Sequence, residues 1–445
     1  MPPTGRILSI LATALALAAF AAPADASRTQ ESIFQDDATL TGSDAAKRDR
    51  ALDELQALGV DTIRSLVIWN TVAPDPTSAS RPAFDATDPA AYPAGAWDRW
   101  DALVAGAEAR GMHVQLTPTG PIPGWASDCR GDYSERRTCQ PDPKEFGDFV
   151  TALARRYPQV TRWSIWNEPN QAGWLTPQYA VTSAGATPSA PHRYRLLVQS
   201  ATAPRAAAGH GGDQILLGET APLGKHSGTL STRSLPPVDF WQELLCLDSK
   251  GRALTGSART VRGCPASYAR LAVTGAAHHP YTRGAGAAPD SSIASDEITL
   301  AKIDRLSLWL DRGARAGRLP RSLPIYLTEY GFQTNPPDKD NGVSPTAQAL
   351  YLAQSDYRAW ANPRIRSVAQ YELYDEPDVA AFQTGLRYFD GTAKPALDAY
   401  RLPVWVFKRS GYDYVWAMVR PVRADAAEQP VTVEYASRAS GPWKR

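Results

Sequence analysis

The chain has 445 residues, of which 43% are hydrophobic and 21% charged, a balance typical of globular proteins. This composition argues against collagen-like, coiled-coil and disordered proteins. The 47 Lys and Arg residues nearly balance the 46 Asp and Glu residues, which gives a formal net charge of +1. Nucleic-acid-binding proteins usually carry clustered positive charge, so the sequence gives no reason to expect a nucleic-acid partner.

The N-terminus has the pattern of a secretory signal peptide spanning residues 1–26. Arg6 supplies the positive charge, 7–22 is an apolar run, and Ala24-Asp25-Ala26 is a small-x-small cleavage signal. A single membrane anchor is the alternative, but the run is short for a span, and no later stretch is long enough. We therefore expect a soluble mature protein, secreted to the extracellular space, with no membrane span.

Four cysteines, Cys129, Cys139, Cys246 and Cys264, fit an oxidising compartment. Four cysteines allow three pairings. We expect the local pairing, 129 with 139 and 246 with 264, because each pair brackets a loop rich in Gly, Arg and Ser. The cysteine and histidine spacings match no common zinc motif, so we expect no metal.

Short apolar runs alternate with stretches of helical periodicity along most of the chain. The runs predict eight strands: 32–35, 62–69, 113–117, 162–166, 214–218, 271–274, 324–328 and 367–371. The periodic stretches predict helices at 44–58, 98–110, 143–156, 192–208, 296–312 and 345–360. Eight alternating strands favour a closed (β/α)8 TIM barrel over an open sheet, and no glycine-rich dinucleotide motif opens the first helix.

The expected barrel spans 27–402. Long loops rich in Pro, Gly and Trp follow its second, third and fourth strands, on the face where this fold builds active sites. From 403 the pattern changes, and 404–407, 412–419 and 431–435 predict three further strands. We expect 403–445 to be a small β-rich extension, a partial or truncated module packed on the barrel.

Two glutamates end predicted barrel strands. Glu168 follows the fourth strand in Asn167-Glu168-Pro169, and Glu329 follows the seventh in Leu327-Thr328-Glu329. A carboxylate buried at a strand end is costly unless it is paired or used. Two carboxylates across one barrel mouth are what acid-assisted glycoside cleavage requires.

The stretch from Trp163 to Asn170 resembles the strand-four motif of the clan A glycoside hydrolases, retaining enzymes that include cellulases, mannanases and β-xylosidases. The resemblance covers roughly 30–402. It implies that Glu168 is the acid/base and Glu329 the nucleophile. It also implies that Asn167 contacts the sugar 2-hydroxyl. The run 328–337, together with 382–386, resembles a secreted, cellulase-like bacterial branch of that clan.

The same resemblance assigns three partners. His279-Pro280-Tyr281 matches the strand-six His-x-Tyr, where the tyrosine hydrogen-bonds the nucleophile, and Arg64 matches the strand-two arginine beside it. From the residues alone, His279 also suits a buried core position, and Arg64 also suits an ion pair with Asp36 or Glu219.

Other residues leave alternatives open. Glu219 is a rival carboxylate, and Glu372 and Asp375 suit either sugar binding or loop support. Strand eight departs from the clan, since many members place a tryptophan platform where this chain has Gln370-Tyr371-Glu372. Among the aromatic residues, Trp166 and Trp174 are candidate sugar platforms, as is Trp125, although each also suits packing.

The sequence thus predicts a monomeric, secreted retaining glycosidase, independent of cofactors, that acts on a β-linked polysaccharide or oligosaccharide. A non-catalytic carbohydrate-binding barrel and a transglycosylase are the alternatives.

Overall fold

The computed structural model of the protein describes residues 30–183, 185–230, 233–420, 430–436 and 440–445. The expected signal peptide, 1–26, lies outside these ranges. Within them, no helix is both long enough and apolar enough to cross a bilayer.

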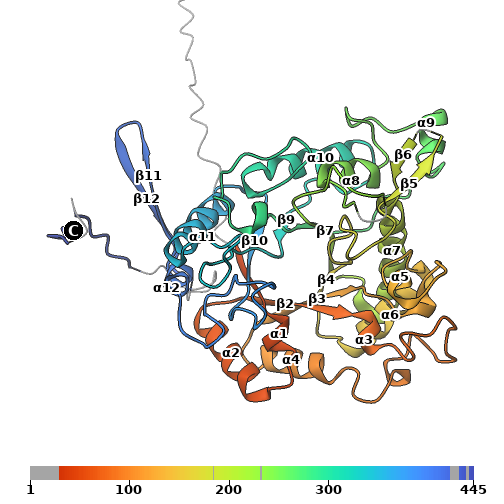
Figure 1. The fold of residues 1–445 in the computed structure, drawn as a ribbon, viewed down its shortest axis with the longest axis horizontal. Coiled ribbons are helices and arrows are strands. Elements are labelled where there is room, and N and C mark those ends of the chain that lie inside the picture. The colour runs from red at the N-terminus through yellow and green to blue at the C-terminus, as the bar shows by residue number, and fades with distance from the viewer. Residues whose placement is uncertain (1–29, 184, 231–232, 421–429, 437–439) are drawn as a thin grey trace, which may run out of the picture.

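Eight parallel strands form a closed barrel, and helices surround it (Figure 1). Neighbouring strands follow chain order, and the last strand pairs with the first in register, Glu31 opposite Ser367. In order, the barrel strands are β1 (Glu31–Gln35), β2 (Thr62–Ile68), β3 (His113–Thr119), β4 (Arg162–Ser164), β7 (Gln214–Thr220), β8 (Gly275–His278), β9 (Ile325–Leu327) and β10 (Ile365–Tyr371). The predicted (β/α)8 TIM barrel is therefore confirmed.

The helices begin where the sequence carries the usual start signals. Asp142 caps the backbone N–H of Glu145 at one helix start, and Ser344 caps that of Ala347 at another, each with proline at the next position. The α-helices are α1 (Asp37–Leu40), α2 (Ala45–Ala57), α3 (Trp69–Val72), α4 (Asp98–Glu108), α5 (Tyr133–Arg136), α6 (Pro143–Arg156), α7 (Ala190–Arg205), α8 (Pro237–Leu244), α9 (Gly256–Val261), α10 (Asp304–Arg315), α11 (Pro345–Trp360) and α12 (Pro395–Arg401).

The sixth barrel strand differs from the prediction. It comprises Gly275–His278, after the predicted run 271–274, and its first position is too crowded for a side chain. A Cβ on Gly275 would lie 2.8 Å from side-chain atoms of both Leu216 and Tyr326. Small residues give a weak strand signal, so the apolar run before them was the misleading feature. The predicted helix 296–312 likewise begins later, at Asp304.

In the described part of the C-terminal extension, β11 (Val404–Arg409) and β12 (Tyr412–Ala417) form a hairpin, which projects from the barrel beside α11 (Figure 1). Its base packs on α11 through Trp416, whose ring contacts Tyr357 and Trp360. The predicted strand 431–435 is wrong: among the described residues it pairs at Tyr435 alone, with Lys444, and its valines are exposed. An unpredicted hairpin, β5 (Tyr179–Thr182) and β6 (Gly185–Pro188), lies in the loop after β4.

Candidate active site

Glu168 lies at the barrel mouth, after the fourth barrel strand, in a segment with a strained backbone. Trp166 and Glu168 have φ angles of 67° and 39°, which non-glycine residues rarely adopt. The backbone N–H of Asn167 donates to Thr119 Oγ1 at 3.0 Å, and that of Glu168 donates to the carbonyl of Glu219 at 3.1 Å. Such strain costs about 1–3 kcal/mol per residue and concentrates at functional sites.

Glu329 lies across the mouth, just after β9, and only 8% of its surface is exposed. Arg64 Nη1 donates to Glu329 Oε1 at 2.7 Å, and the Tyr281 hydroxyl donates to Oε2 at 3.4 Å. His279 Nδ1 is 3.5 Å from Oε2 of Glu329 and 3.0 Å from Oε1 of Glu168. The structure thus brings together the residues that the resemblance assigned.

The separation of the two glutamates selects one type of chemistry. A carboxylate oxygen of Glu168, one of Glu329 and a ring nitrogen of His279 all lie within 4.8 Å of one another. Inverting glycosidases need about 6.5–9.5 Å between carboxyl groups to fit a water molecule, and retaining enzymes need about 5–5.5 Å. The two carboxylate oxygens therefore lie closer together than the inverting arrangement requires.

The surroundings move the pKa values of the two carboxyl groups apart. Burial raises the pKa of Glu168 above its ordinary value, against the opposing hydrogen bond and charge of His279. Burial alone would do the same to Glu329. There, however, the charges of His279 and Arg64, with hydrogen bonds from Arg64 and Tyr281, outweigh it and lower the pKa. Divergent pKa values are how two carboxyl groups divide acid and nucleophile roles.

His279 lies between the two glutamates of this site. Burial alone would lower the pKa of its imidazole, but Glu329 and Glu168 together hold that pKa above its ordinary value. Its side chain is fully buried, and Nε2 has no hydrogen-bond partner among the described residues. His279 is therefore buried as a core histidine would be, but it contacts both glutamates of the site.

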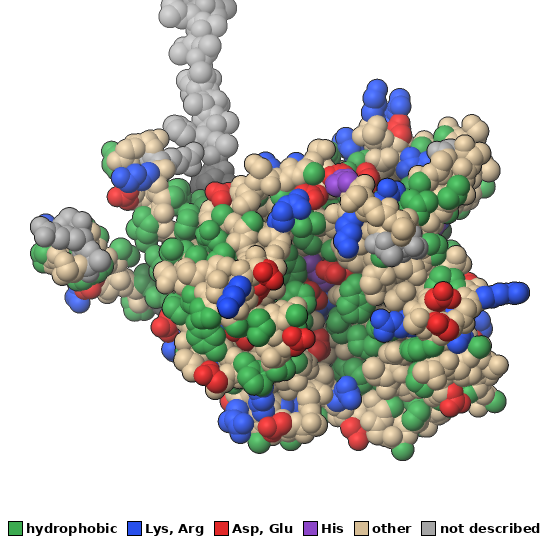
Figure 2. Space-filling view, in the orientation of Figure 1, with side chains coloured by type: hydrophobic (Ala, Val, Ile, Leu, Met, Phe, Trp, Pro, Cys, Tyr) green, Lys and Arg blue, Asp and Glu red, His purple; other side chains and the backbone are tan. Residues whose placement is uncertain are grey.

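A cavity of about 450 Å³ opens over the two glutamates. Figure 2 shows acidic and histidine side chains in the hollow at the centre of this face, with apolar side chains on its walls. Carboxylates, amides and aromatic rings dominate the lining: Gln35, Leu66, Asn167, Glu168, Gln171, Trp174, Ala221, Pro222, Leu223, Tyr281, Thr282, Gly284, Ala285, Glu329, Gln333, Asn341, Tyr371 and Phe382. No Lys, Arg or His is among these lining residues.

Of the tryptophans proposed as platforms, only Trp174 lines the cavity. Trp166 is fully buried and packs edge-to-face on Phe146. Trp125 is 8% exposed and packs in the same way on Trp69. The structure therefore places Trp166 and Trp125 in the core beneath the loops.

The other carboxylates have structural partners. Glu219 lies fully buried behind Arg64, which it binds through two hydrogen bonds, so it is no rival nucleophile in this geometry. Asp36 accepts from the backbone N–H groups of Thr39, Leu373 and Tyr374 and has no bond to Arg64.

Glu372 and Asp375 do not line the cavity, so the structure favours loop support for both. Asp375 pairs with the buried Lys394 at 2.6 Å. Burial and neighbouring acidic groups raise the pKa of Glu372 to about 11, so it is uncharged at neutral pH.

Sequence reasoning missed several lining residues. Gln35 and Tyr371 are the last residues of β1 and β10, a position that marks the mouth of any such barrel. The strand-end rule could have found both. Gln171, Asn341 and Phe382 come from long loops, where no periodic signal places a side chain.

The same three groups, Glu168, His279 and Glu329, are close enough to hold a metal ion. Arg64 is a fixed cation 2.7 Å from Glu329, so it already compensates the negative charge that would otherwise attract a metal ion. In the second such cluster, His192 lies near Cys246 and Cys264, whose sulfurs are joined to each other. The geometry fits paired-carboxylate chemistry better than metal chemistry.

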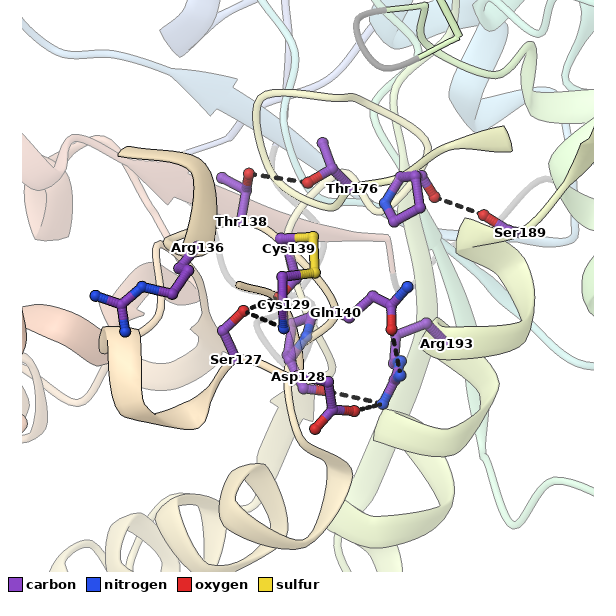
Figure 3. Close-up of a disulfide and its surroundings, with 12 residues drawn as sticks. Ser127, Asp128, Cys129, Arg136, Thr138, Cys139, Gln140, Thr176, Ser189 and Arg193 are labelled. Carbon is purple, nitrogen blue, oxygen red and sulfur yellow. Dashed lines mark hydrogen bonds and ion pairs between the residues drawn. A yellow bond between two sulfur atoms is a disulfide. The ribbon is translucent and has the colours of Figure 1, made fainter. Parts of the chain in front are cut away.

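Both predicted disulfides are present, Cys129–Cys139 and Cys246–Cys264. Thr138 and Thr176 lie beside the first disulfide (Figure 3). Gln140 donates its backbone N–H to the carbonyl of Thr176, and Thr176 donates to the carbonyl of Thr138. The loop that carries Trp174 is thereby bonded to the disulfide loop.

No protein-family model and no curated protein matches this sequence. Solved structures match across most of the chain. A family 39 glycoside hydrolase from Bacteroides cellulosilyticus WH2 is 15% identical, with 87% of this chain and 71% of that chain covered and a TM-score of 0.50. GH5_18 from Streptomyces cattleya, solved with GlcNAc, is 14% identical over 84% and 79%, with a TM-score of 0.51. A β-glucosidase double mutant from Trichoderma harzianum is 14% identical over 80% and 86%, also at 0.51. These matches show that the chain shares the fold of glycoside hydrolases.

Proposed function

We propose that the protein is a retaining glycoside hydrolase that cleaves β-linked oligosaccharides or polysaccharides. One observation carries the proposal. Glu168 and Glu329 present carboxylate oxygens within 4.8 Å of each other at the barrel mouth, and the protein raises the pKa of the first and lowers that of the second. The fold shared with clan A enzymes supports it.

The geometry assigns the two chemical steps. Glu329, held ionised by Arg64 and His279, attacks the anomeric carbon while Glu168 protonates the leaving oxygen, so the glycosidic bond breaks as an ester to Glu329 forms. Glu168, now ionised, then takes a proton from water, and that water releases the sugar. Both carboxyl groups return to their starting states.

Asn167 lies where a sugar 2-hydroxyl would be held. Its Oδ1 accepts from Arg64 Nη2 at 2.9 Å, which fixes the amide and leaves its N–H₂ group for the cavity. Hydrogen bonds to the 2-hydroxyl that strengthen in the transition state contribute several kcal/mol in such enzymes.

The cavity lining favours an uncharged sugar. It carries two carboxylic groups and several amides but no Lys, Arg or His. The nearby cations, Arg64 and His279, are fully buried and already bound to carboxylates. A uronic acid or a sulfated sugar would bring a negative charge next to Glu329 without a counter-ion, which is unfavourable in a partly buried site.

We also propose that the protein is secreted and acts as a monomer. The apolar leader 1–26 and the two disulfides support secretion to the extracellular space. We propose 27–402 as the catalytic domain and 403–445 as a small extension, acting as a monomer on carbohydrate without nucleic acid or cofactor.

Activity assays test the function directly. The purified protein should release aglycone from one or more aryl β-glycosides, or shorten plant, fungal or bacterial wall glycans, and Glu329→Gln should abolish this. Proton NMR should show the β-anomer as the first product. Binding of glycans without turnover would support the non-catalytic alternative. Transfer of the sugar to an added sugar in preference to water would support the transglycosylase.

A further inference from the structure

Glu219 is the last but one residue of β7 and is completely buried. Its Oε1 accepts from Arg64 Nε at 2.9 Å, and its Oε2 accepts from Arg64 Nη2 at 2.5 Å. This is a forked, two-bond pair, the geometry that fixes a guanidinium most firmly. Its backbone is held with a φ of 44°, a conformation that non-glycine residues seldom adopt.

All five N–H groups of Arg64 are used. Besides the two bonds to Glu219, Nη2 donates to Asn167, and Nη1 donates to both Gln35 and Glu329. An arginine can meet a carboxylate through one N–H or through two. Since Glu219 occupies the forked edge, Glu329 receives one bond only.

The pair with Glu219 also divides the charge of Arg64. One guanidinium faces two carboxylates, so part of its field is compensated by Glu219 before it acts on Glu329. If Glu329 itself received two hydrogen bonds from the guanidinium, its ionised form would be more stable. A more stable carboxylate is a weaker nucleophile. A nucleophile without any cation would be protonated in this buried place.

We propose that Glu219 is a positioning residue, which acts through Arg64 to limit the bonds and the charge that reach Glu329. The proposal rests on the proposed function of Glu329 as nucleophile. Glu219 does not line the cavity, and the shortest hydrogen bonds of its carboxylate are the two from Arg64, so the carboxylate acts on the site through the guanidinium. Asn167 is positioned by the same guanidinium.

Several barrel strands contribute titratable and charged groups around Glu329 and its arginine partner. They are Arg64 on β2, Glu168 after β4, Glu219 on β7, His279 and Tyr281 after β8, and Tyr371 on β10. Of these carboxylates, only Glu219 has both oxygens bonded to the arginine. The acid limb of the pH profile of kcat/KM follows ionisation of Glu329. A shift of that limb in Glu219→Gln therefore reports how strongly the charge of Arg64 acts on Glu329.

The test is Glu219→Gln, with kcat/KM measured against pH on an aryl glycoside that the parent protein hydrolyses. The substitution removes the compensating charge and puts an N–H₂ group against a guanidinium edge. The acid limb should move to lower pH, because Arg64 now stabilises ionised Glu329 more strongly. The plateau should fall about tenfold to a hundredfold, as expected for a misplaced reacting group. The rate of covalent trapping by a 2-deoxy-2-fluoro aryl glycoside should fall with it.

Glu243→Gln is the matched control. Glu243 is also a fully buried carboxylate, and it pairs with Arg262 and His192 outside the cavity. Its removal should leave the pH profile unchanged. Glu219→Asp, which keeps the charge, should retain the parent's acid limb, and this variant tests the idea even if Glu219→Gln is poorly folded.

An acid limb and trapping rate in Glu219→Gln equal to those of the parent would overturn the proposal. A fall in plateau with an unmoved acid limb would also overturn it, since loss of fold alone gives that result. Failure of the proposed function has a different signature, because the parent would then lack activity that depends on Glu329.

Discussion

His279 Nδ1 lies 3.0 Å from Glu168 Oε1, and the same nitrogen is 3.5 Å from Glu329. One protonatable ring therefore touches both carboxyl groups of the site. The charge of the imidazole lowers the pKa of Glu329, and its hydrogen bond and charge oppose the burial that raises the pKa of Glu168. This shared contact predicts how the pH profile responds to a single substitution.

His279→Gln should move the whole pH profile of kcat/KM to higher pH. The acid limb follows ionisation of Glu329, whose pKa rises when the imidazolium is removed. The basic limb follows loss of the Glu168 proton, and that pKa rises too, because a partner that favoured the ionised form is gone. His192→Gln, at a histidine outside the cavity, is the control and should leave both limbs in place. Limbs that move in opposite directions would contradict the shared contact.

Trp174→Ala should raise KM for oligosaccharides and leave kcat for small aryl glycosides nearly unchanged. Its ring lines the cavity but lies on a loop, and stacking against a sugar ring acts on binding more than on the reacting bond. Trp443→Ala is the control, since this exposed ring lies outside the cavity. Equal effects on both substrate classes would show that Trp174 only supports the loop.

The two disulfides should differ in their effect on activity. Closing loops with sequence separations of 10 and 18 residues stabilises a chain by about 3 kcal/mol each, measurable by denaturant unfolding of the paired Cys→Ser variants. Loss of Cys129–Cys139 should also raise KM, because its loop is hydrogen-bonded to Thr176 beside Trp174. Loss of Cys246–Cys264 should leave KM unchanged. A rise in KM in that variant too would show that the effect on KM does not come from the Trp174 loop.

Much of the site could be predicted because a parallel barrel brings all strand ends to one mouth. A polar residue at the end of an apolar run is visible in sequence, and Glu168, Glu329 and Arg64 were found in this way or by resemblance. Gln35 and Tyr371 obey the same rule and were missed only because amide and phenol groups do not mark a site as carboxylates do. The local disulfide pairing could be predicted because each cysteine pair brackets a loop rich in Gly, Arg and Ser.

The rest depends on three-dimensional details that spacing does not encode. Trp166 lies between β4 and Glu168, where it has a positive φ, and its indole packs on Phe146 in the core. Arg64 on β2 pairs with Glu219 on β7 and not with Asp36, which follows the neighbouring strand β1. Phe382 reaches the cavity from a loop, where no period predicts the direction of a side chain.

Lys394→Met should destabilise the fold by about 3–5 kcal/mol, because it leaves Asp375 buried without its partner. The double variant with Asp375→Leu should recover most of the loss, since two apolar side chains replace the pair. Lys144→Met, which removes an exposed ion pair with Asp148, should have little effect. Denaturant unfolding measures all three. A small loss in Lys394→Met would mean that Asp375 takes up a proton or water at little cost.

The division of labour between the two glutamates gives the sharpest prediction. Glu168→Ala should impair substrates with poor leaving groups far more than activated aryl glycosides, because an activated group departs without a proton. Added azide should rescue this variant and give a β-azide product, since the glycosyl-enzyme still forms and azide needs no general base. Glu329→Ala should lose activity on both substrate types, because no covalent intermediate can form. If instead added azide gave the β-azide with Glu329→Ala and the α-azide with Glu168→Ala, Glu168 would be the nucleophile and the two roles would be exchanged.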